Sequence, residues 1–174
     1  MIISPGRKYI FVHIPKTGGT AMALALEARA MKDDILIGDT PKAIKRRKRL
    51  KDLQTAGRLW KHSTLADIDG LLGTDQLDEM FLFALVRNPW DRLVSYYHWL
   101  RAQSFDHPAV GLAKAHDFAG FLNEPHTQTS IKAAPYGSYL VDVTGQQRDA
   151  HYIRLEHLAK DLAPLCAHLG FALN

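Results

Sequence analysis

The pattern of apolar and polar positions along the chain predicts a short series of strands and helices. Two apolar runs, at residues 9–12 and 81–86, are typical of strands buried on both faces. Each run is followed by a glycine or a proline and then by apolar residues at helical spacing. We therefore expect strands near 8–13 and 81–86, a third near 151–155 and a shorter one near 35–37.

The segments between these strands supply the expected helices and loops. Helices are expected near residues 20–31, 42–58, 64–72, 90–103, 115–123 and 156–169. Segments 104–114 and 124–150 are rich in Pro, Gly, Ser and Thr and are predicted to be loops, with a short strand near 138–143. Strands that alternate with helices predict an α/β fold with a mostly parallel central sheet and helices on both faces.

The segment from His13 to Thr20 carries the clearest chemical pattern. Gly18 and Gly19 allow a tight turn after the first strand, and Thr20 is the expected N-cap of the next helix. Backbone N–H groups at a helix start attract anions, and Lys16 adds a positive charge. Because Lys16 precedes the glycines, the segment is not a Walker A loop. We predict a phosphate or sulfate site here; an ordinary glycine-containing turn is the alternative.

A second candidate anion site follows the strand near 81–86. Arg87 comes at the carboxyl end of that strand, where ligands bind in open α/β sheets. Ser95 lies on the next helix and points about 150° away from the middle of its apolar face. That face is expected to contain Trp90, Leu93, Val94, Tyr97 and Leu100. Arg87 and Ser95 could therefore hold an anion together, whereas the alternative is that Arg87 only pairs with surface carboxylates.

Residues 15–20 and 87–97 together resemble the sulfotransferases that use 3′-phosphoadenosine-5′-phosphosulfate (PAPS), and the stretch 152–162 resembles a third element of that family. The closest branch is the carbohydrate-type group with a Lys-Thr-Gly-Gly-Thr loop. The resemblance implies a P-loop-like three-layer fold, and it assigns the 3′-phosphate of PAPS to Arg87 and Ser95. It assigns the 5′-phosphosulfate to Lys16, Thr17, Gly18, Gly19 and Thr20.

The same resemblance implies a reaction. A sulfuryl group would pass from PAPS to an acceptor hydroxyl, on a carbohydrate, with adenosine 3′,5′-bisphosphate (PAP) as product and no metal; Lys16 would act on the leaving group. Two alternatives stay open: a nucleotide-binding module without turnover, and a small-molecule kinase of P-loop type. Family members usually continue past residues 169–171, so we expect a single domain over 1–174 that is short at its C-terminus.

His62 is the candidate general base. It precedes the predicted helix near 64–72, whose first turn Thr64 and Asp67 would cap. Transfer to an alcohol needs a group that takes the hydroxyl proton, and histidine suits this role near neutral pH. The family often has a histidine in this stretch. The alternative is a histidine that only caps or packs.

Positive charge is concentrated in one segment. The net charge of the chain is +4, but residues 42–61 alone contain nine Lys or Arg and one Asp. This basic segment is either a solvated face or a patch that attracts an anionic nucleotide or polymeric acceptor. Nucleic acid is not expected, because no reader motif is present. A single cysteine, Cys166, and the lack of a signal peptide or membrane-length apolar run lead us to expect a cytoplasmic protein.

Overall fold

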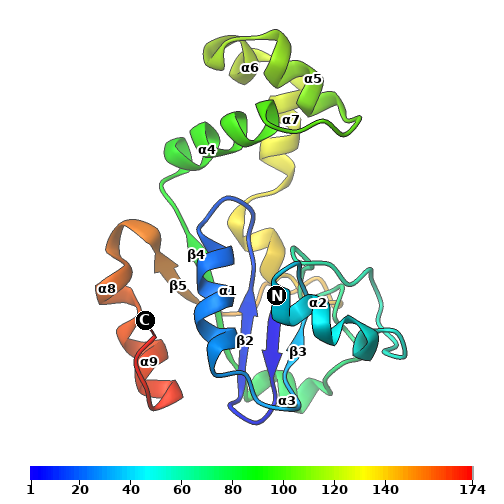
Figure 1. Cartoon of the computed structure of the whole chain (residues 1–174), viewed down its shortest axis with the longest axis vertical. Coiled ribbons are helices and arrows are strands. Elements are labelled where there is room, and N and C mark those ends of the chain that lie inside the picture. Colours follow the sequence, from blue (N-terminus) through cyan, green and yellow to red (C-terminus); the bar gives the residue numbers. More distant parts are fainter. Residues whose placement is uncertain (174) are drawn as a thin grey trace. The chain divides into compact units, whose positions relative to one another are not determined.

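A computed structural model describes residues 1–173, and these form two compact units (Figure 1). The sheet unit contains residues 1–86 and 136–173, and the helical unit contains residues 87–135. Within the described residues, none of the helices has the length and hydropathy needed to span a bilayer.

The sheet unit is built on five strands in the order β3-β1-β2-β4-β5. Their bounds are Ile2–Ser4 (β1), Tyr9–Val12 (β2), Ile35–Leu36 (β3), Phe81–Val86 (β4) and His151–Arg154 (β5). β2 pairs parallel with β4, and β4 with β5, while β1 is antiparallel to both β2 and β3. Four strands therefore point the same way and only β1 is reversed, so the predicted mostly parallel α/β sheet is confirmed. β1 was not predicted, because three residues are too short to show a pattern.

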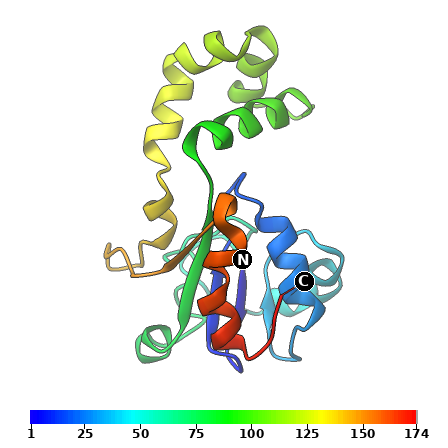
Figure 2. The same cartoon turned by 90° about the vertical axis from the view of Figure 1, so that its left-hand side faces the viewer.

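The two faces of the sheet bury separate clusters of side chains. Phe11 and Phe83 face α1 (Gly19–Ala28), α2 (Pro41–Arg46) and the C-terminal α8 (Leu158–Asp161) and α9 (Ala163–Leu169). Ile10 and Val12 face the turns at 59–72, α3 (Thr74–Asp78) and the 3-10 helix η2 (Tyr136–Leu140). In Figure 2 the sheet is seen nearly edge-on, with α1 (blue) beside one face. Each buried side chain of this size stabilises the fold by about 1.5–3 kcal/mol.

The helix predicted at 64–72 is wrong, since this segment folds as turns. The capping pair does form: Asp67 Oδ2 accepts from the Thr64 amide at 2.7 Å. However, the amides of Leu65 and Ala66 donate to the carbonyls of Tyr139 and Val141, at 3.1 and 3.0 Å. These bonds anchor the start of the segment. A helix is prevented further on, because the Asp67 carbonyl, which would pair with the Leu71 amide, accepts from the Gly57 amide at 3.0 Å. Segment 138–143 correspondingly lacks a regular strand; it holds the end of η2 and one isolated bridge, Val141 to Gln147.

The helix predicted at 42–58 is shorter than expected. α2 passes into the 3-10 helix η1 (Arg47–Leu50), and turns follow. The amides of Ala56 and Gly57 donate to the carbonyls of Asp69 and Asp67, each at 3.0 Å, which holds 56–57 outside any helix. The last predicted helix, 156–169, forms in pieces as η3 (Leu155–His157), α8 and α9.

The helical unit contains two helices where loops were predicted. Its elements are α4 (Pro89–Arg101), α5 (Pro108–Ala115), α6 (Phe118–Asn123) and α7 (Pro125–Ala133), so the loops expected over 104–114 and 124–150 are wrong at 108–114 and 125–133. Pro108 and Pro125 signalled loops, but each occupies the first turn of a helix, where its missing N–H is harmless. The predicted helix 115–123 instead begins at Phe118, because Asp117 caps α6 through a 2.8 Å bond from the Gly120 amide.

Candidate active site

The loop between β2 and α1 turns sharply at two residues. Lys16 has a φ of 66° and Gly18 a φ of 84°, both in the left-handed region. Gly18 is the N-cap and α1 begins at Gly19, so the prediction of Thr20 as the cap is wrong. The cap lies two residues earlier because Gly18, lacking a Cβ, takes the left-handed conformation easily. Thr20 is thereby exposed on the first turn of the helix.

This turn leaves hydrogen-bond donors at the start of α1. The amides of Ala21 and Met22 donate back to the Gly18 carbonyl, at 3.1 and 3.4 Å. In contrast, the amides of Gly18, Gly19 and Thr20 donate to no group within residues 1–173. Neighbouring unsatisfied N–H groups at the positive end of a helix are suited to an anion.

Thr17 stabilises the loop from inside. Its side chain is fully buried, and Oγ1 donates to the Ile14 carbonyl at 2.9 Å. The hydroxyl proton is therefore committed to the main chain, while the oxygen keeps a lone pair. Thr17 is thus a residue that shapes the loop, and Thr20 offers the exposed hydroxyl.

Both glycines are required by their surroundings. A Cβ on Gly18 would lie 3.1 Å from Leu155 Cδ1, in addition to the strain of its positive φ. A Cβ on Gly19 would overlap the imidazole of His13. That imidazole is buried and stacks on Phe11 with ring centroids 5.7 Å apart, so it has little room to move.

Replacing Gly19 with alanine is accordingly expected to destabilise the sheet unit by about 1–3 kcal/mol, the usual range for overpacking. Gly111 is the matched control, because it lies within a helix and a Cβ there meets nothing within 4 Å. Gly111→Ala should be neutral or stabilising by about 0.5–1 kcal/mol. Urea unfolding of the two variants measures both changes, and equal effects would show that the His13 contact is unimportant.

His62 lies against this loop although it is distant in sequence. Its Nδ1 is 2.7 Å from the His13 carbonyl oxygen, and the two imidazoles are 4.8 Å apart between centroids. Since a carbonyl oxygen only accepts, Nδ1 carries the proton, and Nε2 keeps the lone pair. No group in the described part of the chain donates to Nε2. The structure therefore gives His62 the tautomer that a general base needs.

Both histidines are neutral at physiological pH. Burial lowers the pKa of His62 to about 4, although its bond to the His13 carbonyl favours the charged form. Burial also lowers the pKa of His13 to about 3, and the amino group of the N-terminus acts in the same direction. The base form of His62 is thus fully populated near pH 7.

The turn that carries His62 is held firmly. The Trp60 amide donates to Ser63 Oγ at 2.9 Å, and Ser63 itself is buried. Lys61 forms an ion pair with Asp39 at 2.6 Å, and the bond that Lys61 donates lowers the pKa of this carboxyl. These contacts fix the orientation of the imidazole between them.

The stretch 152–162, the third element of the resemblance, joins a strand to a helix. Arg154, the last residue of β5, binds the Asp161 carboxylate through Nε at 2.7 Å and Nη2 at 2.9 Å. These bonds from Arg154 hold the pKa of Asp161 well below its usual range. The paired charges join β5 to α8, and the next residue, Leu155, packs on Gly18.

Arg87 and Ser95 belong to the helical unit. Asn88 caps α4 by accepting from the Trp90 amide at 3.0 Å, which places Arg87 just before the helix start. Tyr97 and Leu100 form the buried face of α4, and Ser95 lies about 140–160° from each of them around the helix. The predicted packed face was wrong for Trp90 and Val94, which are 70% and 39% exposed.

His13 and Leu155 are site residues that sequence reasoning missed. His13 begins the segment 13–20 and Leu155 lies within the stretch 152–162, but their contacts with the two glycines depend on tertiary structure. The only signal was position, since His13 directly follows β2 and Leu155 directly follows β5.

Comparison with known proteins identifies the family and the fold. A family model described as the sulfotransferase family matches residues 1–167. The crystal structure of mouse sulfotransferase SULT7A1 complexed with PAP is similar in fold, with a TM-score of 0.50 and 22% identity. The alignment covers 99% of this chain but only 61% of the mouse chain. No curated protein gave a match. Because the family model matches nearly the whole length of the chain, the chain belongs to the sulfotransferase family.

Proposed function

We propose that this protein transfers a sulfuryl group from PAPS to an acceptor hydroxyl. The observation that carries the proposal is the set of three neighbouring amides, those of Gly18, Gly19 and Thr20, which have no partner among the described residues and begin two positions after Lys16. Fixed donors of this kind fit the 5′-phosphosulfate of the donor nucleotide. The family match and the PAP found in the mouse structure support the same nucleotide.

In this reaction the acceptor oxygen forms a bond to sulfur as the bond from sulfur to the 5′-phosphate oxygen breaks. The acceptor proton passes to Nε2 of His62. Negative charge grows on the departing PAP, where Lys16 and the helix amides stabilise it. His62 is a weak base in the ground state, but the acceptor hydroxyl becomes more acidic as its oxygen bonds to sulfur, so proton transfer becomes favourable late in the step.

We propose that Arg87 and Ser95 hold the 3′-phosphate. Arg87→Ala is expected to weaken PAP by about 10- to 150-fold, the equivalent of about 1.5–3 kcal/mol for a charge-assisted contact. Adenosine 5′-phosphate lacks the 3′-phosphate, so its affinity should change far less. Calorimetry with both nucleotides makes the comparison, and an equal loss for both would contradict the assignment.

We propose a carbohydrate as acceptor and the basic segment 42–61 as a surface that attracts an anionic polymer. Sulfate transfer from labelled PAPS to a mixture of glycans, with simple phenols alongside, tests the acceptor class. Calorimetry with PAP, and with ATP plus magnesium, distinguishes a sulfotransferase from a P-loop kinase. Tight binding of PAP without transfer to any acceptor would favour a nucleotide-binding module instead.

A reducing compartment such as the cytoplasm suits a chain with one cysteine.

A further inference from the structure

A cavity of about 440 Å³ opens on the sheet unit far from the nucleotide loop. Its basic residues are Lys32, Arg46 and Arg49, its acidic residues are Asp33 and Asp34, and its apolar wall is formed by Ile35, Leu36, Leu50 and Leu53. The residues come from the end of α2, from η1 and the turn after it, and from β3 with the segment that enters it. The cavity therefore combines charged groups with an apolar surface.

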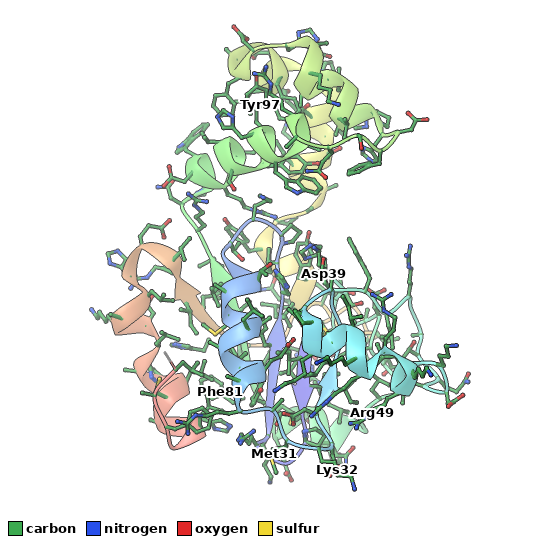
Figure 3. The ribbon with its side chains drawn as sticks, viewed as in Figure 1. Met31, Lys32, Asp39, Arg49, Phe81 and Tyr97 are labelled. Carbon is green, nitrogen blue, oxygen red and sulfur yellow. The ribbon has the colours of Figure 1, made fainter. Side chains whose placement is uncertain are left out.

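The cavity and the nucleotide loop lie toward opposite ends of the sheet's strands. β2 and β3 point the same way, because both are antiparallel to β1. The nucleotide loop follows the end of β2, whereas residues 32–34 precede the start of β3. In Figure 3, Lys32 lies at the lower end of the sheet unit and Asp39, which follows β3, lies toward the other end.

Two arginines of the cavity are held in place and keep donors available. Arg46 Nη1 donates to the Met31 carbonyl at 2.8 Å, and Arg49 Nη1 donates to the Lys32 carbonyl at 2.7 Å. Neither guanidinium pairs with a carboxylate in the region that the structure describes. Each arginine has five N–H donors, so Nε and Nη2 remain for a ligand. Anchored guanidiniums of this kind suit sulfate and carboxylate groups.

Asp34 indicates a second group that a ligand of this cavity would carry. Its side chain is 1% exposed, and Oδ2 accepts from the Met31 amide at 2.8 Å. Oδ1 is buried and has no hydrogen-bond partner among residues 1–173. A buried carboxylate oxygen without a donor is unfavourable, so a bound hydroxyl group would stabilise it. The ligand that suits the whole cavity carries an anionic group, a hydroxyl group and an apolar surface.

We propose that this cavity binds one acidic sugar unit, sulfated or carboxylated, of a polymeric saccharide. The sulfate or carboxylate would contact Arg46 and Arg49, a sugar hydroxyl would donate to Asp34, and the C–H surface of the ring would pack on the leucines. Such a site holds the polymer away from the nucleotide loop. The inference rests on the proposed function only in treating the polymer as an acceptor or product of sulfation, since binding itself needs no turnover.

The basic segment 42–61 also contains residues that serve as matched controls for the two cavity arginines. Arg47 and Lys48 lie between the two cavity arginines but do not line the cavity. A double variant Arg46→Gln/Arg49→Gln and a double variant Arg47→Gln/Lys48→Gln remove the same charge from the same segment. Only the first variant changes residues that line the cavity, and it also removes the bonds from Arg46 and Arg49 to the Met31 and Lys32 carbonyls. Thermal unfolding of both variants checks that they remain folded, and Arg46→Lys/Arg49→Lys keeps the charge if the glutamine variant unfolds.

The probe is a heparin octasaccharide of defined length, titrated by calorimetry at fixed ionic strength. The cavity double variant should lose tenfold or more in affinity and the control less than about threefold. The lysine variant should also lose affinity, because an ammonium lacks the planar fork of a guanidinium. Equal losses in the two glutamine variants, or no binding by the unaltered protein, would overturn the proposal.

PAP serves as the second probe on the same proteins. Its affinity should be the same in every variant, and saturating PAP should leave octasaccharide binding unchanged. Displacement of the octasaccharide by PAP would place the polymer at the nucleotide loop and would overturn the cavity site. Failure of PAP to bind the unaltered protein would instead contradict the proposed function, whatever the octasaccharide does.

Discussion

Replacing His62 with alanine is expected to lower the rate of sulfate transfer by about 10²–10⁴, with little change in PAP affinity. Nδ1 is committed to the His13 carbonyl at 2.7 Å, so Nε2 is the one basic atom that the imidazole presents. Removing it leaves the acceptor proton to water. Single-turnover transfer at saturating PAPS measures the loss. A variant with normal turnover per folded molecule, but lower stability, would show that His62 only packs.

The pH dependence of stability provides a check on the same residue. The folded pKa of His62 is about 4, below the ordinary value of about 6.5, so the unfolded chain binds the extra proton between these two values. Stability should therefore be highest above pH 6.5 and fall as the pH drops toward 4. His62→Phe should reduce this slope, because one of the two buried histidines then no longer titrates. Urea unfolding between pH 5 and 8 tests the expectation.

The elements best predicted from sequence are those whose signal is local. β2 and β4 are continuous apolar runs buried on both faces, and the glycine turn after β2 was recognised from its composition. The turns at 59–72 were missed because their backbone groups bond to other segments: the Asp67 carbonyl accepts from the Gly57 amide, and the amides of Leu65 and Ala66 donate to residues more than seventy positions away. Helices α5 and α7 were missed because proline was taken as a loop signal, although it also starts helices.

In the candidate site, too, local features could be predicted from sequence and long-range contacts could not. Lys16, Gly18 and Gly19 lie within four consecutive residues, so the turn that they form could be recognised from sequence, and its role in anion binding stays a prediction. His62 and His13 are in contact although they are 49 residues apart in the sequence, and the periodicity of apolar residues carries no information about such a contact. The N-cap was misplaced because Thr20 has the side chain of a cap, whereas the backbone turn is decided by the left-handed φ of Gly18.

The charge of Lys16 is expected to be needed for the chemical step. As the bond to sulfur breaks, negative charge grows on the departing 5′-phosphate, and only interactions that strengthen in the transition state raise the rate. Lys16 supplies a full positive charge beside the fixed amides of α1. Lys16→Met should slow transfer by about 10²–10³ and leave PAP affinity within about tenfold. Lys16→Arg should restore the rate only in part, because a planar guanidinium does not replace a compact ammonium in a tight turn.

The backbone of Lys16 allows the charge to be separated from the fold. Its φ of 66° is unfavourable for most residues but tolerated by asparagine and glycine. Lys16→Gly should therefore relieve strain and raise the free energy of unfolding by about 1 kcal/mol, while Lys16→Asn should keep the loop conformation. If charge is what matters, both variants transfer sulfate as slowly as Lys16→Met although the loop is as stable as before or more so. Normal single-turnover rates in Lys16→Met or Lys16→Asn would exclude this role, because both variants lack the ammonium group: Met keeps a side chain of similar length, and Asn tolerates the positive φ.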